Sequence, residues 1–248
     1  RGLPILDGVY SFLAGVRCMH RYRDYLAHEN DILEPISTEA MTKWQQTINQ
    51  GQLIGEHEAL GMLAENGIAA NQSYYVDNLD NAIESVKKLG YPVVLKTAVP
   101  GISHKSEVHG VYLNLNSDAE LRSAYKDLDK RLGPEALLSK MIDKEGVEMI
   151  LGMTTDPQFG PMIALGFGGV YAEILKDVVT LMPPFSAKTA EQALSELKMQ
   201  SLLSGYRGSE AVDVESYCKM ASKFSLFTVA MRNHICEIDV NPIILGKD

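Results

Sequence analysis

Hydrophobic residues recur along the chain at the spacings of both strands and helices, and polar loops separate these segments. The clearest stretch spans residues 93–115. It begins as an apolar run that ends at Lys96, crosses a polar loop, and resumes at Val111 as an alternation of apolar and polar residues. This pattern predicts two strands joined by a loop, and the loop is rich in residues that can bind an anion.

Further segments have apolar residues three or four positions apart, and capping residues mark several of their ends. The predicted helices are residues 9–26, 56–66, 78–89, 119–132, 189–197 and 214–231. Short apolar or alternating runs predict additional strands. These runs are residues 2–6, 73–76, 136–141, 145–152, 162–165, 171–175 and 235–245. Together the elements predict an α/β protein built from two α+β lobes.

The predicted elements group into four parts. Residues 1–35 supply one strand and one helix, which are too few to build a core, so we assign them to a neighbouring domain. Residues 36–52 are predicted to be a polar linker, which Trp44 would dock onto the fold. Residues 53–134 are predicted to form a small lobe, and residues 135–248 a large lobe.

Composition excludes several classes of partner. The net charge of −9 argues against nucleic acid or an anionic membrane, because either would require a concentrated basic face. No apolar run approaches the roughly 20 residues that a membrane span needs. Cys18, Cys218 and Cys236 have no metal-binding or redox spacing, so we expect reduced thiols in a cytoplasmic protein.

Lys96 ends an otherwise apolar strand, and the loop after it holds Gly101, Ser103, His104 and Lys105. One interpretation is that Lys96 is an edge lysine whose amine reaches solvent and that the loop is an ordinary polar turn. The other is that two amines and the backbone N–H groups of the loop bind a phosphate. We favour the second interpretation. His104 could also hold a phosphoryl group, although a loop histidine more often only forms hydrogen bonds.

The last predicted strand carries Glu237, Asp239 and Asn241 at every second position, so their oxygen-bearing side chains face one side. A strand that faces water can show the same alternation. The intervening residues are apolar, however, and two crowded carboxylates without a basic neighbour attract a divalent cation. We therefore predict a Mg²⁺ site at this strand, beside phosphates that Lys96 would contact from the other lobe.

A series of short motifs occurs in order between residues 53 and 245. They are Gly90-Tyr-Pro-Val-Val-Leu-Lys96, Ser103-His-Lys-Ser-Glu-Val108, Gly146-Val-Glu148, Asp156-Pro-Gln-Phe-Gly-Pro161, Gly166-Phe-Gly-Gly169, Leu203-Ser-Gly-Tyr-Arg-Gly208 and Asp239-Val-Asn-Pro242. With these motifs the chain resembles the ATP-grasp domain of nucleoside-diphosphate-forming acyl-CoA synthetases, relatives of the succinyl-CoA synthetase β subunit. The resemblance implies an ATP-grasp fold of two lobes that binds ATP or ADP with Mg²⁺.

The resemblance also implies roles for individual residues. Lys96 would contact the nucleotide phosphates, residues 139–141 would line the adenine, and Glu148 would lie near the nucleotide. The predicted nucleotide-binding set is Lys96, Gly101, Lys105, Ser139, Lys140, Met141 and Glu148, and the predicted metal ligands are Asp239, Asn241 and Glu237. Gly101, Lys105 and Glu237 enter these sets from the residue pattern alone.

His104 and Lys96 are the predicted catalytic residues. His104 resembles the histidine that is proposed in some family members to receive a phosphoryl group from a mobile phosphohistidine and to pass it to ADP. For this step the imidazole must be neutral at the moment of attack, which an unperturbed pKa of about 6.5 permits.

The resemblance implies the nucleotide-binding part of an ADP-forming acid–CoA ligase, an acid–thiol ligase. Such an enzyme converts an acid, CoA and ATP into acyl-CoA, ADP and phosphate through an acyl phosphate and a phosphohistidine. Residues 1–28 resemble the end of the family's CoA-ligase domain, so we expect CoA-binding and ligase domains upstream and CoA as a ligand of the full-length enzyme. The present chain is expected to bind nucleotide without completing turnover. A homo-oligomer is also compatible with these patterns.

Two other functions fit the same fold. One is a regulatory or scaffold module that has lost the ligase chemistry, as in fusions with acetyltransferases. The joint presence of Lys96, His104, Asp239 and Asn241 argues against this function. The other is a carboxylate–amine ligase of the wider ATP-grasp group, which would not explain the CoA-ligase-like residues 1–28.

The sequence departs from the family pattern at two places. His109 stands where the family commonly has glycine in a Gly-Gly-Val turn, so we expect a loop that adopts positive φ less readily and binds nucleotide more weakly. The chain also stops at Asp248, before a stretch that often supplies a further acidic ligand, so we expect weak Mg²⁺ binding.

Overall fold

The computed structural model describes residues 8–27, 33, 35–51, 54–102, 105–142, 146–169, 177–206 and 210–247, without the side chains of residues 21 and 24–27. The chain divides into two compact units, residues 1–33 and 34–248. The first contains α1 (Gly8–Ala27), which confirms the helix predicted over residues 9–26. The strand predicted over residues 2–6 lies outside the described residues. None of the described helices combines the length and the hydrophobicity that crossing a membrane requires.

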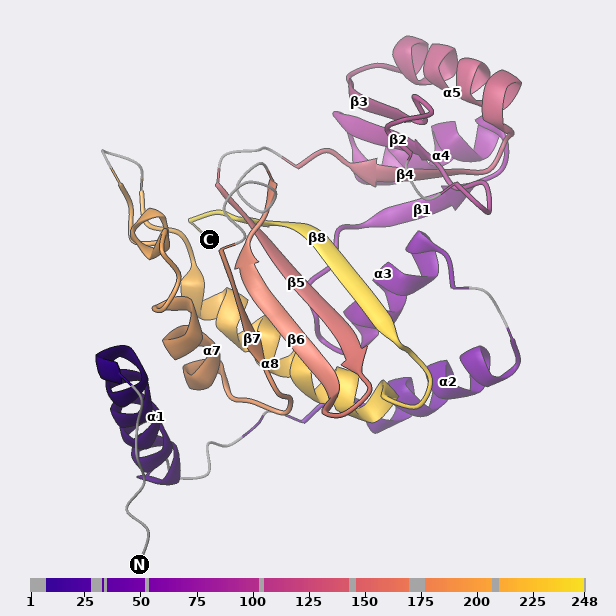
Figure 1. Cartoon of the computed structure of the whole chain (residues 1–248). Coiled ribbons are helices and arrows are strands. Elements are labelled where there is room, and N and C mark those ends of the chain that lie inside the picture. The colour runs from indigo at the N-terminus through magenta and orange to yellow at the C-terminus, as the bar shows by residue number, and fades with distance from the viewer. Residues whose placement is uncertain are drawn as a thin grey trace, which may run out of the picture. The chain divides into compact units, whose positions relative to one another are not determined.

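The small lobe contains one four-stranded antiparallel sheet and two helices (Figure 1). Its elements are β1 (Ser73–Val76), α4 (Leu79–Leu89), β2 (Val93–Thr97), β3 (Val111–Leu115), α5 (Asp118–Leu132) and β4 (Ala136–Lys140). The strand order is β1-β4-β2-β3, and each pairing is antiparallel. The prediction that the large lobe begins at residue 135 is therefore wrong, because β4 forms its ladders with β1 and β2.

Capping residues set the ends of both small-lobe helices. Asn78 precedes α4 and Ser117 precedes α5, and the side chain of each accepts a hydrogen bond from the backbone N–H three residues later. The helices end at Gly90 and Gly133, whose φ angles are 70° and 117°. Glycine adopts positive φ without the clash that a Cβ would cause, so these ends are encoded locally.

The core of the small lobe lies between its sheet and the two helices. Val93 and Leu95 of β2 pack with Ala82 of α4 and Leu121 of α5, and all four are fully buried. Because side chains alternate along a strand, Lys96 points to the opposite face of the sheet. We call this second face, which α4 and α5 do not cover, the open face of the small sheet.

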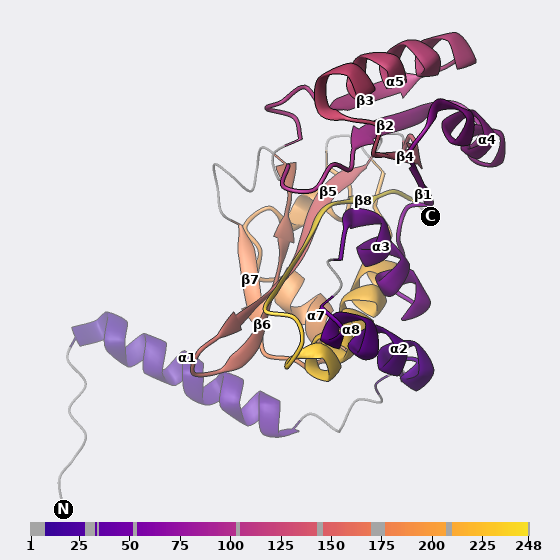
Figure 2. The same ribbon diagram turned by 90° about the vertical axis from the view of Figure 1, so that its right-hand side faces the viewer.

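The large lobe is built on a second four-stranded antiparallel sheet, ordered β7-β6-β5-β8 (Figures 1 and 2). Its strands are β5 (Val147–Asp156), β6 (Gly160–Phe167), β7 (Val178–Leu181) and β8 (Glu237–Leu245). Its helices are α2 (Thr38–Asn49), α3 (Glu56–Glu65), α7 (Ala187–Leu194) and α8 (Val214–Met231), with a short 3-10 helix, η1 (Gln200–Leu202). The strand predicted over residues 171–175 lies outside the described residues.

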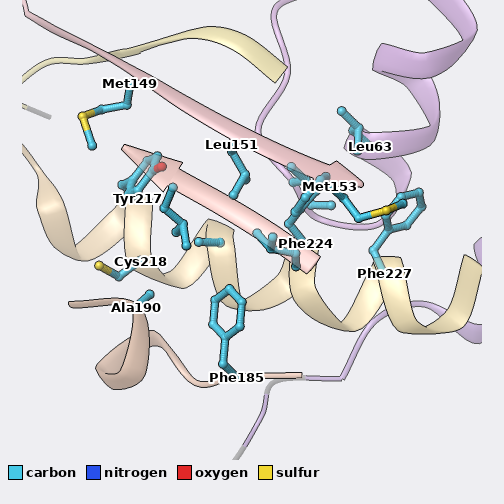
Figure 3. Packing of buried hydrophobic residues seen from close by; sticks show 14 of the residues in the cluster. Leu63, Met149, Leu151, Met153, Phe185, Ala190, Tyr217, Cys218, Phe224 and Phe227 are labelled. Carbon is cyan, nitrogen blue, oxygen red and sulfur yellow. The ribbon is translucent and has the colours of Figure 1, made fainter. Parts of the chain in front are cut away.

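One face of the large sheet packs against α7 and α8 (Figure 3). Met149, Leu151 and Met153 alternate along β5 and are at most 1% exposed. They meet Phe224 and Phe227 of α8, whose ring centroids lie 6.2 Å apart. Burying one such side chain stabilises a fold by roughly 1.5–3 kcal/mol, so this layer fixes the lobe. The other side of the sheet is the open face of the large sheet.

The segment predicted as a linker is instead a packed helix. Ser37 caps the start of α2, and Met41 and Trp44 join the core of the large lobe. The Nε1 atom of Trp44 donates a hydrogen bond of 2.8 Å to the Oε2 atom of Glu65 at the end of α3. The role of Trp44 as the docking residue is confirmed. α2 has only a narrow apolar stripe among polar residues, so the sequence pattern did not predict a helix here.

α3 also belongs with the large lobe, not with the small lobe to which residues 53–134 were assigned. Met62 and Leu63 of α3 are buried in the same core as β5 and α8. At the other end of the helix, His57 Nδ1 lies 3.2 Å from the hydroxyl oxygen of Ser73 on β1. α3 therefore bridges the core of one lobe and the open face of the other.

We expect Trp44→Ala to lower the free energy of unfolding of residues 34–248 by about 3–5 kcal/mol, because it empties a buried aromatic site and removes a hydrogen-bond donor. The measurement is urea unfolding followed by far-ultraviolet circular dichroism. Tyr10→Ala is the control, since Tyr10 on α1 is 91% exposed. Equal stability of the two variants would show that α2 does not contribute to the core.

Candidate functional site

Two predicted site residues share the open face of the small sheet. Lys96 on β2 lies opposite Leu137 of β4, and Ser139 lies opposite Val94. Residues two positions apart on a strand point to the same side, so Ser139 is a diagonal neighbour of Lys96. The side chain of Lys96 is 33% exposed, whereas Ser139 is buried. The amine therefore reaches solvent above a buried polar residue.

The amine of Lys140 is bound by backbone carbonyls away from Lys96. Its Nζ atom donates hydrogen bonds to the carbonyl oxygens of Gly90 and Tyr91, at 3.0 and 2.9 Å. These carbonyls follow the end of α4, where a cation is also favoured by the helix dipole. The backbone N–H of Met141 donates to the carbonyl of Pro92 at 3.0 Å. Lys140 and Met141 thus fasten β4 to the turn before β2, and the structure does not bring the Lys140 amine to Lys96.

The polar loop, residues 98–110, joins β2 to β3. Ser103 and His104, the predicted catalytic histidine, lie outside the described residues. Gly101 has a φ of 88°, and the N–H of Gly110 donates to the carbonyl of Lys105 at 2.8 Å. A side chain on Gly110 would meet Thr97 at 2.7 Å, so the loop closes tightly against the end of β2.

His109 adopts a φ of 51°, although it lacks the conformational freedom of glycine. The positive φ that we expected a histidine to adopt less readily is therefore present at this position. Arg131 of α5 holds the strained turn, since its Nη1 donates to the carbonyl of Val108 and its Nη2 to that of His109, at 3.1 and 2.9 Å. Asp127 accepts from the Nε atom of Arg131 at 2.8 Å. Hydrogen bonds from α5 thus hold a backbone conformation that glycine would adopt without such support.

Glu56, the first residue of α3, lies between the two predicted phosphate-binding lysines. Its Oε1 atom is 3.1 Å from Nζ of Lys96, and its Oε2 atom pairs with Nζ of Lys105. Burial would raise the pKa of the Glu56 carboxyl, but hydrogen bonds and positive charge from Lys105 and Lys96 outweigh burial and lower that pKa. The carboxylate therefore stays ionised at neutral pH.

The predicted metal ligands lie on the open face of the large sheet. Glu237, Asp239 and Asn241 are exposed, whereas the intervening Ile238 and Val240 are half-buried and pack against the core. The predicted alternation along this strand is confirmed. A pocket of about 310 Å³ lies on this face and is lined by residues including Glu237 and Asp239.

Glu148 occupies the same face of the large sheet. Glu148 and Gly152 are four residues apart on β5, and Gly152 lies opposite Asp239 of β8. At about 3.3 Å per residue, the backbones of Glu148 and Asp239 are offset by roughly 13 Å along the sheet. Gly169, with a φ of 59°, lies against the Glu148 carboxylate, and a side chain there would collide with it. The glycine leaves room for this carboxylate.

Comparison with known proteins identifies the fold. The family described as the ATP-grasp domain matches residues 46–248. The chain belongs to the ATP-grasp family. This ATP-grasp domain therefore carries its candidate residues on the open faces of its two sheets, with Lys96 on the small sheet and Asp239 on the large sheet.

The relatives of this ATP-grasp domain include ADP-forming acyl-CoA ligases. The β subunit of acetate–CoA ligase (ADP-forming) II from Pyrococcus furiosus is 34% identical over 218 residues, which cover 84% of this chain and 92% of that subunit. Trans-feruloyl-CoA synthase from an unknown prokaryotic organism is 37% identical over 200 residues, 78% of this chain. The match spans only 28% of that relative, so the chain corresponds to one part of a longer protein there.

A solved structure has the same fold. Dinucleotide-forming acetyl-coenzyme A synthetase 1 of Ca. Korarchaeum cryptofilum, crystallised with coenzyme A and Mg-AMPPCP, is 33% identical with a TM-score of 0.73. The match covers 84% of this chain and 93% of that chain. The two-lobed α/β architecture expected from the motifs is therefore confirmed.

The donor set on β8 fits an oxygen-coordinated cation. Asp239 and Glu237 offer carboxylates and Asn241 offers an amide oxygen, which are ligands that Mg²⁺ prefers. Within the described residues, no three histidine, cysteine, aspartate or glutamate side chains converge into a ready-made metal site. A cation held here would need further oxygen atoms from phosphates or water, as Mg²⁺ usually does.

Sequence patterns missed Glu56 and Arg131, which contact the candidate lysines and the polar loop. Glu56 appears in the sequence as an acidic residue in the first turn of a helix, which the helix dipole alone explains. Arg131 appears as a basic residue in a last turn for the same reason. The lysines that contact Glu56 are 40 and 49 residues away in the sequence, and the carbonyls that Arg131 binds are 22 and 23 residues away, so no local signal could have found these contacts.

We expect His109→Val to destabilise the protein by about 1–2 kcal/mol, because a β-branched residue resists the left-handed conformation. His109→Gly should cost nothing or stabilise slightly, since glycine adopts this φ freely. Urea unfolding of the two variants and the wild type measures the difference. If His109→Val were as stable as His109→Gly, the left-handed turn would not exist in solution.

Proposed function

We propose that this chain is the nucleotide-binding, phosphoryl-transferring part of an ADP-forming acid–CoA ligase. The complete enzyme would convert an acid, CoA and ATP into acyl-CoA, ADP and phosphate. The proposal is supported by the family and by the 92% coverage of a β subunit that has this activity in its name. The observation that carries it is the paired cationic site, in which Lys96 and Lys105 direct their amines to one point.

In this proposal the protein acts mainly by positioning groups and neutralising charge. The amines of Lys96 and Lys105 would bind the terminal phosphates, and the N–H groups around Gly101 would add donors. Ser139 and Met141 would border the base, and Glu148 would lie near the nucleotide. Mg²⁺, held by Asp239 and Asn241 with help from Glu237, would neutralise charge on the phosphate oxygens.

His104 would carry the phosphoryl group within this part of the enzyme. In the direction that forms ATP, a β-phosphate oxygen of ADP attacks the phosphorus on the His104 ring, the P–O bond forms and the P–N bond breaks. The ring leaves with the electron pair of that bond and is ready to accept another phosphoryl group. In the opposite direction, the γ-phosphoryl group of ATP moves to the neutral ring nitrogen and ADP leaves.

The other substrates would bind to domains outside this chain. The korarchaeal relative was solved with coenzyme A and with its phosphohistidine segment pointing towards the nucleotide-binding site. We assign residues 1–35 to the end of a CoA-ligase domain, which would bind CoA and supply such a segment. This assignment is supported by α1, a separate unit whose apolar residues Val9, Leu13 and Met19 are exposed.

Lys96→Met should weaken the binding of Mg·ADP by about 10- to 100-fold, because it removes a charge-assisted hydrogen bond to phosphate. Isothermal titration calorimetry on the folded protein measures this affinity. Lys87→Met, an exposed lysine in the last turn of α4, is the matched control and should bind as the wild type does. An equal loss in both variants, or a wild type that binds no ADP, would contradict the proposal.

His104→Ala should abolish the transfer of phosphate from γ-labelled ATP to the polypeptide segment that contains residue 104, and slow acyl-CoA formation by the full-length protein. The measurement is label retained on the protein, located by peptide mapping. His20→Ala on α1 is the control, because that histidine is exposed and lies in the other unit. Labelling that survives the loss of His104 would remove this residue from the relay.

A further inference from the structure

Lys96 and Lys105 already have an anionic partner within the protein. The two carboxylate oxygens of Glu56 are shared between them, with Oε1 on Lys96 and Oε2 on Lys105. All three side chains keep some contact with solvent, at 33% for Lys96, 22% for Lys105 and 34% for Glu56. The site that would receive a phosphate therefore holds a carboxylate that an incoming anion can reach.

A phosphate that binds both amines competes with Glu56. One oxygen of the Glu56 carboxylate lies against each amine, as two oxygens of a bound phosphate would. An ionised carboxylate left beside a bound phosphate would also repel it, and the neighbouring lysines favour the ionised form of Glu56. We therefore expect binding to exchange one anion for the other.

We propose that Glu56 is an internal counter-ion that competes with the nucleotide's polyphosphate for Lys96 and Lys105. This inference deepens the proposed function and rests on its assignment of the two lysines to phosphate. The competing ligand is a polyphosphate, whether a nucleoside diphosphate or free pyrophosphate. The Glu56 carboxylate offsets the repulsion between the two lysine ammonium groups. An anion that binds the two amines more weakly than Glu56 does would not displace it.

The location of Glu56 gives the exchange a structural consequence. Glu56 begins α3, and Met62 and Leu63 of the same helix are buried in the core of the large lobe. Lys96 belongs to the small sheet. The ion pairs therefore join the contact of His57 with Ser73 in holding the start of α3 to the small lobe. A polyphosphate that displaces Glu56 breaks the ion pairs while the rest of α3 stays packed.

The test compares Glu56→Gln with the wild type by calorimetric titration with pyrophosphate and, separately, with ADP. The uncharged amide cannot compete as a counter-ion, so we expect Glu56→Gln to bind pyrophosphate about tenfold tighter, equivalent to ~1.4 kcal/mol. Glu58→Gln removes the same charge two residues later on α3 and should change the affinity less than about twofold, since that residue would act only through screened long-range charge. Glu56→Asp keeps the charge but shortens the reach, and should lie between the wild type and Glu56→Gln.

Several outcomes separate this inference from the proposed function. If pyrophosphate binds tighter to Glu56→Gln but no variant binds ADP, the counter-ion is supported and the nucleotide function fails. If Glu56→Gln binds pyrophosphate no better than the wild type, or no variant binds it, the inference is overturned. A gain equal to that of Glu58→Gln would also overturn it, because general electrostatics would then suffice.

A second measurement does not depend on ligand affinity. Acylation of lysine amines, read by peptide mass mapping, should proceed several-fold faster at Lys96 and Lys105 in Glu56→Gln than in the wild type, because an amine that is not held in an ion pair is more accessible to the reagent. Lys87 on α4 is the internal reference and should react equally in both proteins. Unchanged reactivity at both lysines would show that Glu56 does not pair with them in solution.

Discussion

Each sheet of this protein packs one of its faces against helices, and the candidate residues lie on the other face. In the small lobe α4 and α5 cover one face, and in the large lobe α7 and α8 cover one face. Because side chains alternate along a strand, the core takes one set of alternate positions and leaves the other. Lys96 and Ser139 fall in the remaining set of the small sheet, and Glu148 and Asp239 in that of the large sheet.

The strengths of the contacts around α3 explain how one helix can serve both lobes. Ion pairs that remain partly exposed, such as that of Glu56 with Lys96, are typically worth about 0–1 kcal/mol each. Burial of one large apolar side chain, such as Leu63, is worth roughly 1.5–3 kcal/mol. The charged end of α3 can therefore exchange its partners while the apolar end keeps the helix in place. The proposed binding thus depends on the weak contacts, and the stability of α3 depends on the strong ones.

Much of the fold could be predicted from local pattern. The helix over Val214–Met231, the strand Ser73–Val76 and the alternation of Asp239 with its neighbours are encoded by nearby residues. The features that were not predicted depend mostly on contacts between residues far apart in the sequence. α2 has too few apolar residues to stand out, β4 belongs to the small sheet because of partners distant in sequence, and Glu56 meets lysines 40 and 49 residues away. Hydrophobic periodicity predicts which face of a helix or strand is buried, but not which other element packs against that face.

One extra residue in β8 allows the start of the strand to line the open face and its end to join the core. Asp239 is exposed, whereas Ile243 and Leu245 pack into the core, yet all three are separated by even numbers of residues. A regular strand would place them on one face. β8 carries one residue more than β5 opposite Ile150, and this β-bulge reverses the alternation. Pro242 lies at the bulge, where a residue without an N–H costs the ladder nothing. The bulge thus lets a strand that begins with candidate cation ligands end as part of the hydrophobic core.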